Sequence, residues 1–188
     1  NSTACVVSPR YRFDLLLNNL VAWAYTTGKV YLKSDGTSCR PIGHIEDISR
    51  AFAAALTAPE ANIHNQAFNV GRNEDNYRIA DLANMVAEIV PNSRVEISSD
   101  HFPDARNYKV DCSKIEEQLP GFEPVWNARK GAEQLLETYQ RLRLSAGEFE
   151  GMRYQRIKHI KYLLQKGNID QNLYWVHETK KIVHDGNI

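Results

Sequence analysis

The sequence predicts an α/β domain in which a small mixed sheet packs against helices. Segments whose apolar residues recur three and four positions apart alternate with short segments in which apolar and polar residues alternate. Turn-forming Gly, Pro, Asn and Asp residues separate them. This alternation of helices and strands is typical of α/β folds. At 188 residues, the chain is long enough to bury one medium-sized core.

The expected elements follow in order along the chain. They are a strand near residues 1–7, helix 14–27, strand 29–33, a helix after residue 47, strand 67–71, helix 79–90, strand 94–98, short helices at 113–119 and 127–139, and a basic amphipathic helix at 153–165. Gly28 and Pro91 are helix-stop signals, and Asp47 and Asn127 are predicted N-caps. Asp111 or Ser113 is expected to cap the helix that leads to Leu119.

Two helices carry apolar faces. The helix after residue 47 places Ile48, Phe52, Ala55 and Leu56 on one side. In the basic helix we expect Tyr154, Ile157, Ile160 and Leu164 to point inward.

Composition excludes several classes of function. The 23 basic and 23 acidic side chains cancel, which argues against a nucleic-acid partner. No run of about 18 apolar residues occurs, so we expect no membrane span. The three cysteines form no Cys-x-x-Cys pair and the six histidines are scattered, which predicts a cytoplasmic protein without a metal site.

Two arginines are candidate phosphate ligands. Arg40 stands between a turn and a predicted strand, where its planar charged fork can bind a diphosphate bidentately. The alternative is a structural arginine paired with a carboxylate such as Asp35. Arg106 is the second candidate, and its alternative is a solvated loop charge.

For other polar residues, the sequence pattern indicates a binding role less specifically. Asn18 and Asn19 lie in a helix that is apolar on one side, where an amide can bind a sugar or phosphate oxygen or can simply face solvent. His44 is expected to be a hydrogen-bonded structural residue, and Asn69 a strand-end amide that bonds a turn.

Four motifs occur in an order that resembles the extended short-chain dehydrogenases/reductases, specifically the NAD-dependent nucleotide-sugar epimerases and dehydratases. The motifs are Asn1-x-Thr3 leading to Ser8-Pro9-Arg10; Gly36-x-x-x-Arg40-Pro-x-x-His44-x-x-Asp47; Phe68-Asn69-Val70-Gly71 with Asn76 opening a helix; and Asp104-x-Arg106-x-Tyr108-x-x-Asp111-x-Ser113-Lys114 ahead of Leu119-x-Gly121-Phe122-x-Pro124. The resemblance covers roughly residues 1–142 and implies the C-terminal, substrate-binding part of a Rossmann-type enzyme.

The resemblance implies roles for individual residues. Arg40 matches the arginine that contacts the nucleotide diphosphate, and Asn18 lies where the family has an asparagine. Tyr31 and Leu32 fall where the base rests on a strand. Thr3 matches a position that lines the sugar pocket. The set of implied substrate-binding residues is Arg40, Arg106, Asn18, Thr3, Tyr31, Leu32 and His101.

His101 departs from the family pattern. Relatives in the epimerase branch often have an arginine there, and a histidine is the poorer anion ligand at neutral pH. The sequence therefore does not determine which anionic group the substrate carries.

The reaction of this family needs a dinucleotide-binding loop and a catalytic Tyr-x-x-x-Lys pair, and this sequence shows neither in the expected place. None of the ten glycines forms a G-x-x-G-x-x-G loop for a dinucleotide pyrophosphate. The pattern Tyr-x-x-x-Lys occurs at Tyr25, Tyr154 and Tyr162, but none of the three stands where the family places its catalytic pair. We therefore expect that the dinucleotide-binding half is missing, that NAD or NADP belongs to the intact parent, and that this chain alone binds no cofactor and has no catalytic residues.

Residues 1–144 are expected to form the substrate-binding portion with the end of the Rossmann core, and residues 145–188 a helical C-terminal extension. The predicted function is the substrate-binding half of an NAD(P)-dependent nucleotide-sugar epimerase or dehydratase. The expected partners are a nucleotide-sugar-like molecule, the missing half or another subunit, and a further copy in a homo-oligomer. Two alternatives stay open: a non-catalytic interaction module that uses the basic helix, and part of a related ketone reductase with a non-nucleotide substrate.

Overall fold

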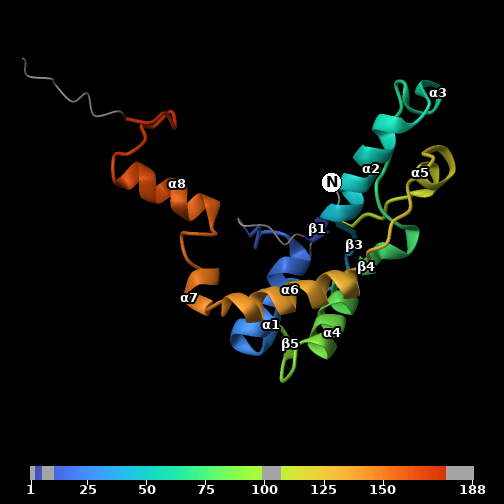
Figure 1. The fold of residues 1–188 in the computed structure, drawn as a ribbon. Helices are drawn as coiled ribbons and strands as arrows, with labels where there is room; N and C mark the ends of the chain where they lie inside the picture. Colours follow the sequence, from blue (N-terminus) through green and yellow to red (C-terminus); the bar gives the residue numbers. More distant parts are fainter. Residues whose placement is uncertain (1–2, 6–10, 99–106, 177–188) are drawn as a thin grey trace, which may run out of the picture.

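The computed structural model describes residues 3–5, 11–98 and 107–176 as small sheets surrounded by helices (Figure 1). The predicted α/β class is therefore confirmed. The elements are β1 (Thr3–Cys5), α1 (Leu16–Thr27), β2 (Lys29–Leu32), β3 (Cys39–His44), α2 (Ile45–Thr57), α3 (Glu60–Ile63), η1 (Asn73–Asp75), β4 (Asn76–Arg78), α4 (Ile79–Ile89), β5 (Arg94–Ile97), α5 (Ser113–Gln118), α6 (Ala128–Leu142), α7 (Ala146–Phe149) and α8 (Arg156–Gln165).

The described strands form two sheets. In the first, β3 is central, with β1 parallel on one side and β4 antiparallel on the other. This register places Thr3 opposite Ile42 and Arg40 opposite Tyr77. The second sheet is the parallel pair β2 and β5. The mixed strand directions agree with the prediction.

The main core lies where α1, α4 and α6 meet around β2. Leu17, Leu82, Val86 and Ala132 are fully buried there. Such burial of apolar side chains is the main favourable contribution to folding. A smaller apolar cluster joins α2 to α5 and contains Ala51, Ala54, Ile115, Leu119 and Phe122.

Several predicted helix ends are confirmed. Gly28 adopts a left-handed conformation, with φ of 71°, and its N–H donates to the carbonyl of Ala24. Helix α4 ends at Ile89, just before Pro91. Asn127 caps α6, because its side-chain oxygen accepts from the N–H of Lys130 at 2.9 Å.

The predicted N-cap of α2 is wrong. The helix begins at Ile45, two residues before Asp47, and His44 is its N-cap. The ring of His44 accepts from the N–H of Glu46 at 3.2 Å. Asp47 instead lies in the first helical turn, where its carboxylate accepts from the N–H groups of Val125 and Trp126.

The apolar side of α2 does not coincide with its buried side. Ala51 and Ala54 pack against the smaller cluster, whereas Phe52 is 71% exposed and Leu56 is 88% exposed. Small side chains on the inner side let the helix approach the residues that follow α5. Periodicity alone did not distinguish these two faces.

Residues 67–71 do not form the predicted strand, and Asn76 lies in β4 rather than at the start of a helix. Side-chain hydrogen bonds replace a strand ladder here. The amide of Asn69 donates to the carbonyl of Asp111 at 2.9 Å. The side chain of Asn76 donates to the carbonyl of Val110 and accepts from its N–H. Helix α4 accordingly starts at Ile79.

The basic helix is shorter and more exposed than predicted. It begins at Arg156, and none of its residues is buried. Ile157 is 71% exposed and does not point inward. Tyr154, which precedes the helix, packs on the core through Tyr11 and Phe13. Over the part of the chain that the structure describes, no helix has the length and apolar character to cross a bilayer.

Candidate functional site

Strand β3 carries the central candidate, Arg40. Only 6% of this arginine is exposed. Its Nη1 donates to the carbonyl of Cys39 at 2.6 Å, and its guanidinium lies 5.2 Å from the centre of the Tyr108 ring. Stacking on an aromatic ring holds the plane of an arginine side chain in one orientation. This geometry suits an anion ligand and equally suits a structural arginine.

The segment after Arg106 docks beside Arg40. The side-chain oxygen of Asn107 accepts from the N–H of Cys39 at 3.0 Å, and Tyr108 then stacks on Arg40. Two motifs whose contacting residues are 68 positions apart in sequence therefore meet on β3. Arg106 and His101, the other two predicted anion ligands, lie outside the described residues.

Strand β2 holds Ser98, the residue that follows β5. The N–H of Ser98 donates to the carbonyl of Leu32 at 2.9 Å. The predicted site residues Tyr31 and Leu32 lie on β2, and Arg40 lies on β3.

The side chains on β2 differ in their surroundings. Leu32 is 3% exposed and belongs to the main core. Tyr31 is half-buried, and its ring lies 5.9 Å from that of Trp23 on α1. Because Leu32 is occupied by core packing, Tyr31 is the side chain of this pair that remains partly accessible.

Asn18 and Thr3 lie on neighbouring elements. Asn18 is fully buried in α1, and its backbone carbonyl accepts from the hydroxyl of Tyr139 at 3.3 Å. The interpretation of Asn18 as a solvent-facing surface amide is therefore wrong. Asn19 is held as well, because its amide donates to the carbonyl of Phe13. Thr3 lies on β1, in register with Ile42 of β3.

At the other end of β3, both ring nitrogens of His44 have hydrogen-bond partners. Its Nδ1 accepts from the N–H of Glu46, so the proton of the neutral ring is on Nε2, which lies 3.0 Å from Oε1 of Gln134. The ring stacks on that of Trp126, with 3.8 Å between centres and 11° between planes. Both ring nitrogens are thus engaged in structural contacts.

A hydrogen-bonded pair lies next to β3, between the buried Asp75 of η1 and the half-buried Tyr77 of β4. The hydroxyl of Tyr77 donates to Oδ1 of Asp75 at 2.8 Å, and Arg72 approaches Asp75 to 3.7 Å. Burial raises the pKa of Asp75 above its usual value, although the hydrogen bond from Tyr77 and the charge of Arg72 oppose this. Burial, followed by the bond to Asp75, raises the pKa of Tyr77 to about 12.

Sequence reasoning missed the partners that hold these residues. Trp126 and Gln134 position His44, and Asn107 secures the segment beside Arg40. Asn107 and Tyr108 do lie inside a motif recognised in the sequence, whereas no spacing rule points to Gln134, which is 90 residues from His44.

The three Tyr-x-x-x-Lys pairs do not form a common site. Tyr25 lies in the last turn of α1, while Lys29 begins β2. Tyr154 packs on aromatic core residues. Tyr162 lies on α8 near its C-cap Lys166, with 5.9 Å between the ammonium and the ring centre. Within the described ranges, no group of three His, Cys, Asp or Glu side chains has the geometry of a metal site.

Comparison with known proteins supports the resemblance over part of the chain. Residues 6–71 match the sequence model of the NAD dependent epimerase/dehydratase family. This range contains α1, β2, β3 and α2, and therefore Arg40 and His44.

Solved structures share the fold of the chain. UDP-glucuronic acid 4-epimerase from Bacillus cereus, in complex with UDP-glucuronic acid and NAD, has a TM-score of 0.58 and 22% identity; the match covers 72% of this chain and 43% of the epimerase. For dTDP-glucose 4,6-dehydratase from Bacillus anthracis, in complex with NAD, the values are 0.56 and 17%, over 72% and 42% of the two chains. A monomeric L-threonine 3-dehydrogenase from a metagenome gives 0.56 and 17%, over 69% and 42%.

These matches establish the fold. The chain shares the α/β fold of the parts that it matches, and it spans less than half the length of each of these three enzymes.

Proposed function

We propose that this chain is the substrate-binding half of an NAD(P)-dependent epimerase or dehydratase that acts on a nucleotide sugar. The observation that carries the proposal is the meeting of the two arginine-bearing motifs on β3, where Asn107 bonds to Cys39 and Tyr108 stacks on Arg40. The family match over residues 6–71 supports the same function independently.

In this proposal Arg40 and Arg106 bind the diphosphate. Two guanidinium groups provide paired N–H donors that match phosphate oxygens, and the buried position of Arg40 strengthens the attraction because little water competes. His101 contributes a third, weaker donor. Tyr31 supports the base beside Leu32, while Asn18 and Thr3 orient the diphosphate and the sugar.

The cofactor does not fit the residues of this chain. A dinucleotide needs a glycine-rich turn that lets its pyrophosphate approach a helix N-terminus, and the sequence contains no such spacing. We therefore assign to this chain the binding and orientation of the substrate and no step of hydride transfer.

Calorimetric titration with UDP-, GDP- and dTDP-sugars tests the proposal. We expect one of these classes to bind, and the Arg40→Ala variant to lose about 1.5–3 kcal/mol of binding free energy, the value of a hydrogen bond to a charged group. Arg50→Ala, which removes an exposed arginine on α2, is the matched control and should bind as the parent does.

Unchanged affinity in Arg40→Ala would exclude Arg40 as a ligand and leave it a structural role. A ketone reductase with a non-nucleotide substrate is the second candidate. The similarity in fold to L-threonine 3-dehydrogenase favours it, because that name describes an enzyme for a small amino-acid substrate. Failure of all three nucleotide sugars to bind would support this second candidate.

A further inference from the structure

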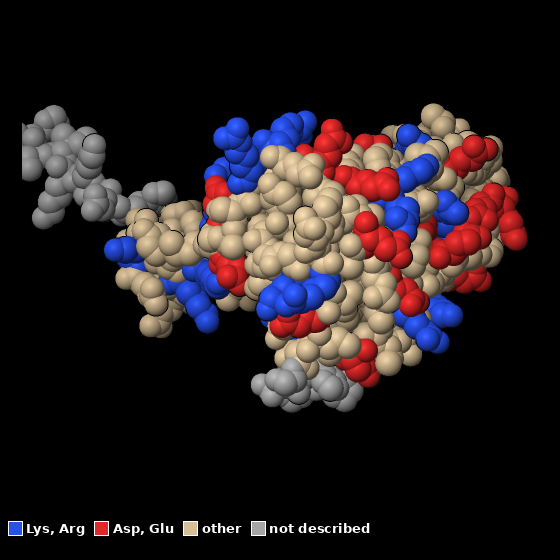
Figure 2. All heavy atoms as spheres, turned by 90° about the horizontal axis from the view of Figure 1, so that it is seen from below, with Lys and Arg blue, Asp and Glu red and all other residues tan. Residues whose placement is uncertain are grey.

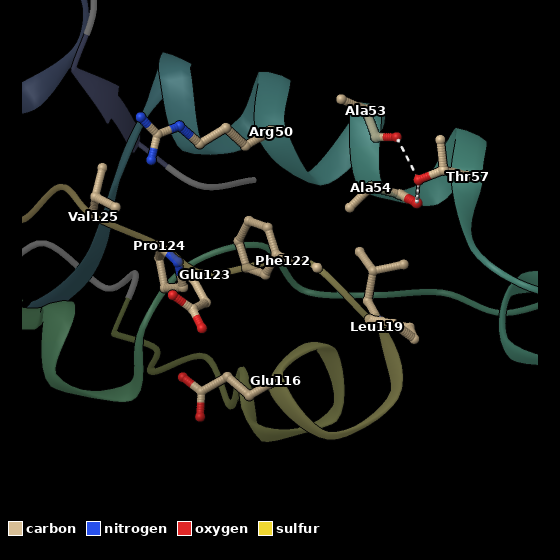
Figure 3. A pocket seen from close by; sticks show the side chains of 12 residues that line it. Arg50, Ala53, Ala54, Thr57, Glu116, Leu119, Phe122, Glu123, Pro124 and Val125 are labelled. Atoms are coloured by element: carbon tan, nitrogen blue, oxygen red, sulfur yellow. Dashed lines mark hydrogen bonds between the residues drawn. The ribbon is translucent and has the colours of Figure 1, made fainter.

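A groove runs between α2 and the segment that contains α5 and the residues after it. It has a volume of about 1180 Å³ and its base includes Ala53 of α2 together with Leu119 and Phe122. Figure 3 shows Glu116 and Glu123 on the α5 side of the groove and Arg50 extending along α2. Both glutamates are exposed, so the α5 side has an acidic edge above an apolar base.

Helix α8 has the complementary pattern. Ile157, Ile160 and Leu164 follow one another at steps of three and four, and their exposed fractions are 71%, 38% and 36%. Lys158 and Lys161, one turn apart, lie along one side of this stripe. Residues 151–167 contain five basic side chains and no acidic one.

Figure 2 shows basic side chains around the end that carries α8, and many acidic side chains, with basic ones among them, at the opposite end. Figure 1 places α2 and α5 at that opposite end. A basic amphipathic helix and an acidic-edged apolar groove match the helix-in-groove mode of recognition.

The helix cannot reach the groove of its own chain. The groove ends at Val125, just before α6, and α8 follows the far end of α6. At 1.5 Å per residue, the 15 residues of α6 separate these ends by about 22 Å. Phe149 and Tyr154 then anchor the connection to Phe13, with ring centres 4.9 and 5.2 Å apart.

We propose that α8 of one copy of this chain docks in the groove between α2 and α5 of a second copy. Each copy has one α8 and one groove, so a twofold axis allows both contacts to form at once. In each contact the stripe of Ile157, Ile160 and Leu164 covers the apolar base, and Lys158 and Lys161 face Glu116 and Glu123. This inference does not depend on the proposed substrate.

Analytical ultracentrifugation over roughly 1 to 200 µM protein, the range in which weak dimers dissociate, tests the proposal. We expect a monomer–dimer equilibrium that weakens as salt is raised. Lys161→Glu and Glu123→Lys should each raise the dissociation constant at least about tenfold, because each brings like charges together. Lys166→Glu, the same charge change on the opposite side of the helix axis, should alter it less than about twofold.

A charge-exchange experiment separates this interface from any other. Lys158→Glu/Lys161→Glu and Glu116→Lys/Glu123→Lys should each be monomeric alone, and an equimolar mixture should form the heterodimer, in which both contacts regain opposite charges. A wild-type protein that stays monomeric throughout overturns the proposal, and so does a dimer that neither double variant weakens. All four altered side chains are exposed, so folding should be retained, which circular dichroism checks.

Discussion

His44 and Asp47 together hold α2 against the residues that precede α6. His44 ends the strand, caps the helix and stacks on Trp126. Asp47, one turn further on, accepts hydrogen bonds from the N–H groups of Val125 and Trp126 at 3.1 and 3.0 Å. A carboxylate that is 4% exposed is tolerated there because two donors and the helix N-terminus compensate its charge.

Replacing Asp47 by alanine should lower the free energy of unfolding by about 2–3 kcal/mol, because two partly buried N–H donors lose a charged acceptor. Asp47→Asn, which keeps one acceptor oxygen, should cost less. Asp81→Ala removes an exposed acid from the first turn of α4 and should cost only about 0.3–1 kcal/mol. Urea denaturation of the three variants measures the differences, and equal losses for Asp47 and Asp81 would contradict this role.

At the scale of elements, β3 contacts most parts of the candidate site. It pairs with β1 and β4, carries Arg40, ends in the cap of α2 and receives Asn107 and Tyr108 at its start. Strand β4 has only three residues, and its central Tyr77 lies opposite Arg40. The hydroxyl of Tyr77 donates to Asp75 of η1, just before the strand.

This pair predicts a loss of stability at alkaline pH. The pKa of Tyr77 is raised from 10.0 to about 12 in the folded chain. The unfolded chain therefore releases this proton first, and the stabilisation is complete below pH 10.0 and lost as pH rises toward 12. Between these values wild type should lose more stability than Tyr77→Phe. Urea denaturation at matched pH, with tyrosinate absorbance in parallel, measures both, and equal pH slopes would refute the assignment.

The periodic elements were predictable, and the contacts that build the site were not. Helices α1, α4 and α6 and strands β2 and β5 follow local patterns, and Gly28, Pro91 and Asn127 mark ends that the structure confirms. The buried face of α2 and the course of residues 67–76 depend instead on partners around residues 110–122, which no local period encodes.

At the scale of the whole molecule, aromatic packing connects the C-terminal segment to the main core. Phe149 of α7 is 1% exposed and packs edge-on against Phe13 and Trp23, with ring centres 4.9 and 5.3 Å away. Beyond Tyr154 the chain leaves the core, and no residue of α8 is buried. Helix α7 therefore packs with the main core, and the domain boundary near residue 144 stays a prediction.

Phe149→Ala should lower the free energy of unfolding by about 3–5 kcal/mol, as expected for deleting a buried ring and leaving a cavity. Leu142→Ala is the control, because this α6 side chain is 52% exposed and should change stability by no more than about 0.5 kcal/mol. Thermal and urea denaturation compare the two. A small effect at Phe149 would mean that α7 is independent of the core.

By itself, the sequence determined the α/β class, the order of the periodic helices and strands, and a set of motifs similar to those of nucleotide-sugar epimerases and dehydratases. These follow from local propensity and spacing, which each segment carries within itself. Only the tertiary structure decided that Asn107 and Tyr108 meet Arg40, that His44 rather than Asp47 caps α2, and that α8 lies exposed. These outcomes depend on contacts between residues far apart in the chain, and burial selects among the local alternatives.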